Sequence, residues 1–290
     1  MLRAASATSR GSHLARLPAQ SLFILGAISQ YLGSAFAVLL FAAVPAAGVA
    51  WLRVVAAAAV LVAWRQPWRT RWSRARLRLV TAFGFALGLM NLCFYLSIDR
   101  LPLGTAVAIE FCGPIAVAAL GSRTRRDLAA LALAAGGVAA LADVHLSGSP
   151  DGFALAAAAG LFWALYIILG HRLAGDEGIR PQDGLALGMA IGAVGLAPAL
   201  VVSAVPALVS PLLLGACVLV GVTSSVVPYA LEQIAMRRLP RARFALLLAL
   251  LPATAAVVGA IVLGQVPGVV EAAGVALVVV AASLRTHAEA

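Results

Sequence analysis

The stretch NLCFYLSIDRLPLGTAVAIEFCGP, residues 91–114, decides the fold of this chain. It closes one long apolar run, turns through polar residues at 99–100 and a proline at 102, and opens a second apolar run. Each run is close to the ~20 residues that cross the hydrocarbon core of a bilayer as a helix. The second run contains a carboxylate, Glu110, followed at once by Gly113 and Pro114. The stretch therefore predicts two membrane spans joined by a tight turn, the second of which carries an uncommon intramembrane charge.

The composition of the whole chain agrees with a membrane protein. Of its 290 residues, 63% are hydrophobic and only 11% are charged, whereas soluble domains carry about a quarter charged residues. The net charge of +10 would also suit a nucleic-acid-binding protein. The arginines, however, stand in short gaps between apolar runs, which is the pattern of membrane topology. No nucleic-acid partner is therefore expected, and the lipid bilayer is the expected surroundings.

Apolar runs bounded by charge, proline or glycine predict an all-α integral membrane protein with ten transmembrane helices. The expected spans are residues 20–42, 44–64, 79–98, 102–120, 127–142, 152–170, 184–204, 211–233, 242–263 and 268–284. Small residues four positions apart predict close contacts between some of these helices, because they let helix backbones approach. These residues are Gly84 with Gly88, and Gly184 with Gly188 and Gly192.

The arginines predict the orientation of the chain. All 21 basic residues are arginines; Arg53 lies inside a span, and Arg100 alone lies in one set of connections. The remaining 19 lie in the alternate connections and in the two tails. Because cytoplasmic loops carry the excess of positive charge, we expect both termini in the cytoplasm.

An internal repeat divides the chain into two halves. Leu101-Pro102 recurs as Leu239-Pro240, Pro114 as Pro252, and Gly136 as Gly274, all at an offset of 138 residues. With five spans each, the halves would cross the membrane in opposite senses, which is a common transporter design. The sequence thus predicts two inverted five-helix repeats, residues 19–144 and 145–285, between cytoplasmic tails at 1–18 and 286–290.

Three charged residues inside spans are the strongest candidates for function. Arg53 and Glu110 lie at similar depths, so they could pair with each other, or Arg53 could receive a substrate carboxylate. A carboxylate beside the helix break expected at Gly113 and Pro114 suits an ammonium group or a proton. Glu232 lies nearer the cytoplasmic end, where it is either a gate carboxylate or a surface partner of Arg237. A purely architectural role for the Arg53–Glu110 pair stays open.

Polar and aromatic residues one helical turn apart form three further candidate pairs. They are Asn91 with Tyr95, Trp163 with Tyr166, and Ser225 with Tyr229, with Pro228 inside the last pair. We expect them to line a central cavity, although packing or interfacial anchoring explains the aromatic residues equally well. Pro228 and Pro252 are expected helix breaks like Gly113 and Pro114.

The sequence contains no motif of an enzyme, a nucleotide-binding loop or a metal site. Neither a cofactor nor a metal is therefore expected, and the cysteines Cys93, Cys112 and Cys217 lie singly within apolar runs. The chain leaves no room for the soluble nucleotide domain of an ATP-driven pump. The expected activity is secondary transport, and self-association into a homo-oligomer stays open.

The stretch at 91–114 resembles the signature of the threonine/homoserine exporters, which belong to the drug/metabolite transporter superfamily, EamA type. Similar segments lie at 52–53, 66–69, 160–175 (GLFWALYIILGHRLAG), 224–232 (SSVVPYALE) and 238–244 (RLPRARF). The resemblance implies a multi-pass protein of the bacterial inner membrane with ten helices in two inverted repeats. It also implies export of small amino acids driven by an ion gradient, with protons as the expected coupling ion.

Three positions depart from the pattern of these exporters. Leu251 and Gln265 stand where the family usually has Glu, and Val38 stands where a Lys is frequent. Arg53, Glu110 and Glu232 are retained. We therefore expect an exporter of threonine, homoserine or related small amino acids. Alternatives are an exporter of another metabolite or drug-like compound, and a non-transporting membrane or lipid-handling module.

Overall fold

A computed structural model describes residues 18–121, 124–145, 149–176, 178–239 and 247–286. Within these ranges the secondary structure is helical throughout, with turns and without strands. The side chains of some helical residues, among them Glu232, lie outside the described part. The expectation of an all-α protein is confirmed for the described residues.

The first half of the chain contains six α-helices and one short 3-10 turn, η2, between α2 and α3. Their bounds are α1 Ala19–Leu40, α2 Ala46–Arg65, η2 Pro67–Arg69, α3 Arg74–Ile98, α4 Leu103–Glu110, α5 Cys112–Gly121 and α6 Arg125–His145. The fourth expected span is thus two helices in series, since α4 ends at Glu110 and α5 begins at Cys112. Pro102 precedes α4 and Pro45 precedes α2, because proline suits the entry to a helix and has no N–H to satisfy.

Within the described residues, the second half contains six α-helices and one π-helical turn, η3. The bounds are α7 Pro150–Ala174, α8 Pro181–Leu208, α9 Pro211–Gly221, the π-helical turn η3 Val222–Val226, α10 Val227–Arg238, α12 Leu251–Leu263 and α13 Val269–Thr286. The span expected at 211–233 is therefore α9 and α10 with η3 between them. Most of the residues expected to begin the ninth span, 242–246, lie outside the described part.

Among the described residues, six helices are long and apolar enough to cross a membrane, namely α1, α2, α3, α7, α8 and the continuous run from Pro211 to Tyr229. Four shorter apolar helices cover Leu103–Val117, Leu128–Leu141, Leu251–Leu263 and Val269–Leu284. Each of these apolar stretches overlaps one of the expected spans, and Leu251–Leu263 covers only the second part of the span expected at 242–263. Length and composition thus agree with a multi-pass protein.

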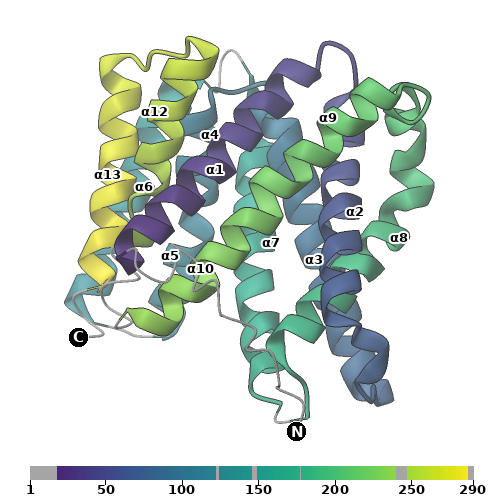
Figure 1. The fold of residues 1–290 in the computed structure, drawn as a ribbon. Helices are drawn as coiled ribbons and strands as arrows, with labels where there is room; N and C mark the ends of the chain where they lie inside the picture. Colours follow the sequence, from purple (N-terminus) through teal and green to yellow (C-terminus); the bar gives the residue numbers. More distant parts are fainter. Residues whose placement is uncertain (1–17, 122–123, 146–148, 177, 240–246, 287–290) are drawn as a thin grey trace, which may run out of the picture.

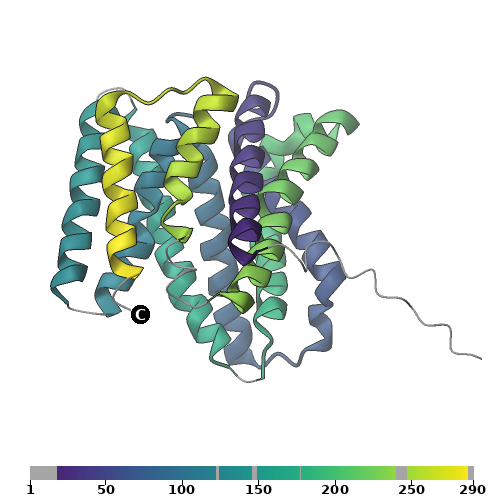
Figure 2. The same cartoon turned by 60° about the vertical axis from the view of Figure 1, so that its left-hand side comes forward.

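The helices run roughly along one direction and pack into a single bundle (Figures 1 and 2). Helices α6, α12 and α13 lie together at one side, and α2, α3 and α8 lie at the other. Between them, α3 packs against α7, while α1 packs against α10 and α12. The α2–α3 and α7–α8 connections lie at the lower end of Figure 1, where α1 begins and α13 ends. The α1–α2, α8–α9 and α12–α13 connections lie at the upper end.

Glycines form the contact between α3 and α8; their spacing predicted close helix contacts without naming the helices that meet. A Cβ on Gly84 would clash with the carbonyl of Gly188, and one on Gly192 would clash with the carbonyl of Gly84. In a bilayer, helix association depends on such close packing, because lipid tails are as apolar as the helix surfaces. This contact therefore fixes the first half of the chain directly against the second.

Candidate functional site

Arg53 is the centre of a buried polar network between α2 and η3. Its side chain is on the inner face of α2, and the residue is only 7% exposed. Nε donates to Ser225 Oγ at 3.0 Å, and Nη2 donates to the carbonyl oxygen of Ser224 at 2.8 Å. The guanidinium also lies 5.0 Å from the centroid of the Tyr95 ring, within cation–π range. These contacts bring together three residues that the sequence proposed, Arg53, Tyr95 and Ser225.

Pro228 removes one of the backbone donors that the carbonyl bound by Arg53 would have in a regular helix. A helical carbonyl normally accepts from the N–H four residues later, or five residues later in a π turn. Pro228 stands four residues after Ser224 and five after Thr223, and it has no N–H to donate. Both carbonyls have side-chain donors instead: Arg53 donates to Ser224, and Ser29 Oγ of α1 donates to Thr223 at 2.7 Å. The π turn η3 directly precedes α10, in which Pro228 lies; a helix break at Pro228 itself stays a prediction.

Glu110 lies at a second interruption, the junction of α4 and α5. Pro114 cannot donate to the carbonyl of Glu110 four residues earlier, so the helix is interrupted at Phe111. Gly113 lets α5 approach α7, since a Cβ there would clash with the carbonyl of Gly160. The N-terminus of α4 is capped from the second half, where Gln265 Oε1 accepts the Leu103 N–H at 2.9 Å.

The Glu110 carboxylate is buried without a direct partner in the described part of the chain. Glu110 is 8% exposed, and no hydrogen bond or ion pair to another described side chain engages it. Arg53 is the charged group that acts on it electrostatically. Within the described residues, the two charges do not form the direct pair that the sequence allowed, because the Arg53 guanidinium binds η3 instead. Bridging by a ligand remains as a prediction.

The remaining candidate residues occupy different environments. Asn91 is buried and donates to the Leu87 carbonyl of its own helix at 2.8 Å. Tyr95 is fully buried, and its hydroxyl lies 3.5 Å from Ser224 Oγ. Trp163 packs edge-on against Phe111 at the α4–α5 junction, at 5.1 Å between ring centroids. Tyr95 therefore belongs to the Arg53 network, and Trp163 lies at the α4–α5 junction beside Glu110; a cavity that joins them stays a prediction.

Tyr166 packs on Phe83, at 4.9 Å between ring centroids, and this contact belongs to a separate apolar cluster of α3 and α7. Tyr229 is half-buried on α10. Glu232 lies on α10, but its side chain is outside the described part of the chain. Pro252 is the second residue of α12, directly after a turn at 249–250. Turn residues thus lie at Phe111 and at 249–250, close to the two repeat-related prolines.

Sequence reasoning missed several polar residues that hold this region together. Ser224 and Ser29 were not singled out, although each provides a contact to η3. The run Thr223-Ser224-Ser225 before Pro228 was the available signal, because hydroxyl residues next to a proline often accompany an interrupted helix. Within the described residues no group of three or more His, Cys, Asp or Glu could hold a metal ion.

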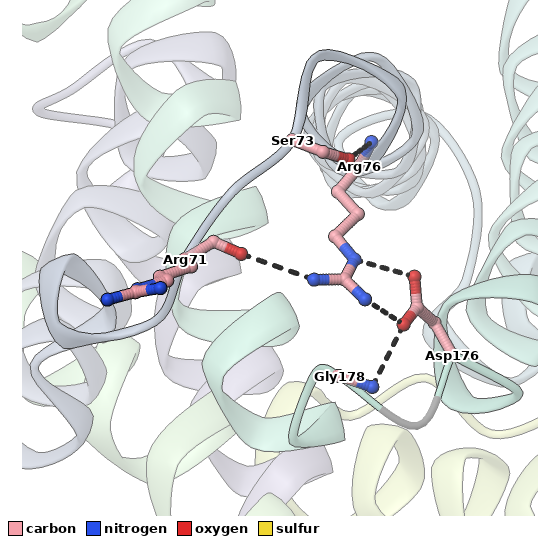
Figure 3. Close-up of polar contacts among 5 residues, drawn as sticks. All are labelled: Arg71, Ser73, Arg76, Asp176 and Gly178. Carbon is pink, nitrogen blue, oxygen red and sulfur yellow. Dashed lines mark hydrogen bonds and ion pairs between the residues drawn. The ribbon is translucent and has the colours of Figure 1, made fainter.

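Two ion pairs at the lower end of the bundle connect the α2–α3 and α7–α8 connections. Arg65 Nη2 lies 2.9 Å from Asp183 Oδ1, and Thr70 Oγ1 donates to Asp183 Oδ2 at 2.9 Å. Arg76 donates to the Asp176 carboxylate through Nε and Nη2 at 2.8 and 2.7 Å, and the Gly178 N–H donates to the same carboxylate (Figure 3). The Arg76 and Gly178 hydrogen bonds lower the pKa of Asp176. Arginines that the sequence marked only as topology signals therefore also have specific partners.

Comparison with known proteins finds relatives that cover most of the chain. Residues 151–286 match the EamA-like transporter family. Threonine/homoserine exporter RhtA of Salmonella typhimurium strain LT2 is 40% identical over 236 residues, which cover 80% of this chain and 79% of that protein. The protein of the same name from Escherichia coli K12 is 39% identical over the same shares. A solved crystal structure with 20% identity superposes with a TM-score of 0.56, covers 91% of this chain and 96% of its own, and supports the fold alone.

Proposed function

Because the chain belongs to the EamA-like transporter family, we propose that it exports threonine, homoserine or related small amino acids from the bacterial cell. Its relatives are named as exporters, so the chain is a membrane transporter and not an enzyme. The apolar helices and these relatives agree on a multi-pass protein of the inner membrane. Substrate identity and the coupling ion are the parts that this proposal adds.

The observation that carries the proposal is a pair of opposite buried charges that do not bind each other. Arg53 uses Nε and one Nη2 N–H for η3, which leaves Nη1 and the second Nη2 N–H for a ligand. Among the described residues Glu110 has no direct partner, and an unpaired buried carboxylate is costly. An amino acid at neutral pH carries one carboxylate and one ammonium group. Its carboxylate would bind Arg53, and its ammonium would bind Glu110.

Proton coupling follows from the same arrangement. Without substrate, Glu110 lowers its electrostatic cost by binding a proton; with substrate, the ammonium replaces that proton. Protonation and substrate binding at Glu110 are then mutually exclusive. Proton entry would therefore accompany substrate export, which is secondary active transport.

We also propose ten membrane spans in two inverted five-helix repeats, 19–144 and 145–285, with both termini cytoplasmic. Contacts between helices support the repeat, because a contact between one helix of each half recurs between the two helices at the corresponding positions of the opposite halves. Thus α3 packs on α7 as α10 packs on α1, and α3 packs on α8 as α9 packs on α2. The interruptions at Phe111 and at 249–250 are related by the same offset. The orientation rests on the arginine distribution.

The test is proton-driven uptake of labelled threonine into inverted membrane vesicles. Glu110→Gln keeps the shape of the side chain and removes its charge, so it should abolish concentrative uptake at equal protein level. Asp151→Asn, which removes an exposed carboxylate from the first turn of α7, should leave uptake unchanged. Full uptake by the Glu110 variant would reject the role of Glu110. Exchange without accumulation would assign Glu110 to coupling and leave substrate binding to other groups.

The same vesicles separate the two alternative functions. Uptake of hydrophobic cations or other metabolites in preference to threonine would favour an exporter of drug-like compounds. Absence of transport of every solute, with movement of labelled lipid between leaflets, would favour a lipid-handling module.

A further inference from the structure

The segment between α2 and α3 carries more positive charge than the protein neutralises. Two of its arginines, Arg65 and Arg76, pair with Asp183 and Asp176. Four others are exposed, and among the described residues no hydrogen bond or ion pair engages their guanidinium groups. They are Arg69, Arg71, Arg74 and Arg78. We call residues 64–78 the arginine–tryptophan segment.

The backbone of this segment is fixed by specific contacts. Gln66 ends α2 in the left-handed region with φ 51°, and its N–H donates to the Val62 carbonyl. Trp72 Nε1 donates to the Pro67 carbonyl at 2.9 Å, and Thr70 is tied to Asp183. Ser73 Oγ caps α3 by accepting the Arg76 N–H. The four exposed guanidinium groups are therefore displayed from a defined frame and not from a loose tail.

Two tryptophans in the same segment are exposed to an unusual degree. Trp64 at the end of α2 is 67% exposed, and Trp68 in η2 is 65% exposed. Indole rings favour the boundary between lipid tails and headgroups, because the ring is apolar and its N–H is polar. In Figure 1 this segment lies at the lower end of the bundle, where the apolar part of α2 ends. The two rings thus mark the depth at which headgroups meet the protein.

We propose that the arginine–tryptophan segment is a binding site for anionic phospholipid headgroups. Guanidinium groups bind phosphate oxygens bidentately, and juxtamembrane basic clusters attract anionic lipids. A lipid satisfies both halves of the site at once: its phosphate binds the exposed arginines, and its acyl chains cover Trp64 and Trp68. A soluble phosphate would satisfy only the arginines. The proposal of this lipid site requires neither the assigned substrate nor the assigned orientation of the protein in the membrane.

The direct test uses the exposed tryptophans as reporters. The full-length protein is reconstituted into phosphatidylcholine vesicles that contain a minor fraction of phosphatidylglycerol, with bromine on the acyl chains of one lipid at a time. Brominated phosphatidylglycerol should quench tryptophan fluorescence with an apparent affinity roughly tenfold above that of brominated phosphatidylcholine. Trp64→Phe with Trp68→Phe should remove most of this quenching, which assigns the signal to the segment.

Charge variants decide whether the four arginines are responsible. Changing Arg69, Arg71, Arg74 and Arg78 together to Gln should reduce the preference for phosphatidylglycerol to within about twofold. The control changes the equally exposed Arg125, Arg126, Arg172 and Arg180 to Gln, which alters the net charge by the same amount and should keep the preference. High salt should weaken the preference of the unmodified protein.

Three results would overturn the proposal. The first is equal quenching by both lipids in the unmodified protein, and the second is an equal loss in the control variant. The third is displacement of the lipid signal by soluble glycerol phosphate at modest excess, which would make the segment a site for free phosphate compounds.

Discussion

Arg53 donates to the carbonyl oxygen of Ser224 at 2.8 Å across 171 positions of sequence. This bond joins α2 to the π turn η3 between α9 and α10. It exists because the helix around Ser224 has released a carbonyl that a regular α-helix would occupy. A change in the π turn would therefore alter the position of the guanidinium that we assign to the substrate carboxylate.

Pro228→Ala tests this connection. Alanine restores an N–H that competes with Arg53 for the Ser224 carbonyl and with Ser29 for the Thr223 carbonyl. The helix should become more regular and gain up to about 3 kcal/mol of local stability, while threonine uptake into vesicles falls. Pro198→Ala is the control, because Pro198 also lies inside a helix, α8, and is exposed. Unaltered transport by Pro228→Ala would show that the released carbonyls are dispensable.

Arg53 and Ser225 should affect substrate affinity in different ways. Arg53→Lys loses the fork of donors that can bind Ser225, Ser224 and a carboxylate together, so the apparent KM for threonine should rise at least roughly tenfold. Ser225→Ala leaves Nε of Arg53 without its acceptor and should raise KM less than Arg53→Lys does. Ser225→Thr keeps the hydroxyl and should restore the KM of the unmodified protein. Threoninol and N-acetylthreonine, which lack one charge each, should compete poorly in the unmodified protein. Strong competition by either compound would contradict recognition of both charges.

Two glycine substitutions should have opposite effects on stability. A Cβ on Gly84 would clash with the Gly188 carbonyl, so Gly84→Ala should lower stability by about 1–3 kcal/mol. Nothing lies within 4 Å of a Cβ on Gly136 in α6, so Gly136→Ala should raise stability by up to about 1 kcal/mol. Thermal unfolding in detergent measures both. A stable Gly84 variant would mean that α3 and α8 can separate without cost.

The Arg76–Asp176 pair predicts a pH dependence. Because its hydrogen bonds lower the pKa of Asp176 in the folded protein, the pair contributes stability above the unfolded pKa of about 4. That contribution is lost as the pH falls through the lower folded value. The effect should be small, since both side chains are partly exposed and screened. Unfolding temperatures of the unmodified protein and of Asp176→Asn should therefore differ at neutral pH and converge in acid; a constant difference would exclude the ionised pair as its cause.

Cysteine labelling tests the orientation. In a variant without Cys93, Cys112 and Cys217, single cysteines are placed at the exposed Arg74, where α3 begins, and at the exposed Val266, in the α12–α13 connection. The α2–α3 and α12–α13 connections lie at opposite ends of the bundle (Figure 1). A membrane-impermeant maleimide added to intact cells should label the cysteine at 266 and not the one at 74. Labelling at 74 alone would reverse the proposed topology.

Local properties of the sequence were sufficient to predict the helices. Apolar runs and the charges and prolines between them depend on neighbours within a few residues, so ten apolar stretches could be located within a few positions of the helices observed. Burial of Arg53 and Glu110 also followed from the sequence, because each stands inside such a run. Close helix packing at Gly84 and Gly188 was indicated by residue size, whereas the pairing of α3 with α8 was not.

Only the tertiary structure decided which groups these residues contact. The sequence allowed Arg53 to pair directly with Glu110, but the guanidinium binds Ser224 and Ser225 instead. Likewise, the sequence identified Arg65 and Arg76 only as topology signals, whereas the structure pairs them with Asp183 and Asp176. Such partners are separated by 100 residues or more, and no local pattern specifies them. They are selected when packed helices fix the distances, because a buried charge binds whichever polar group the fold brings within reach.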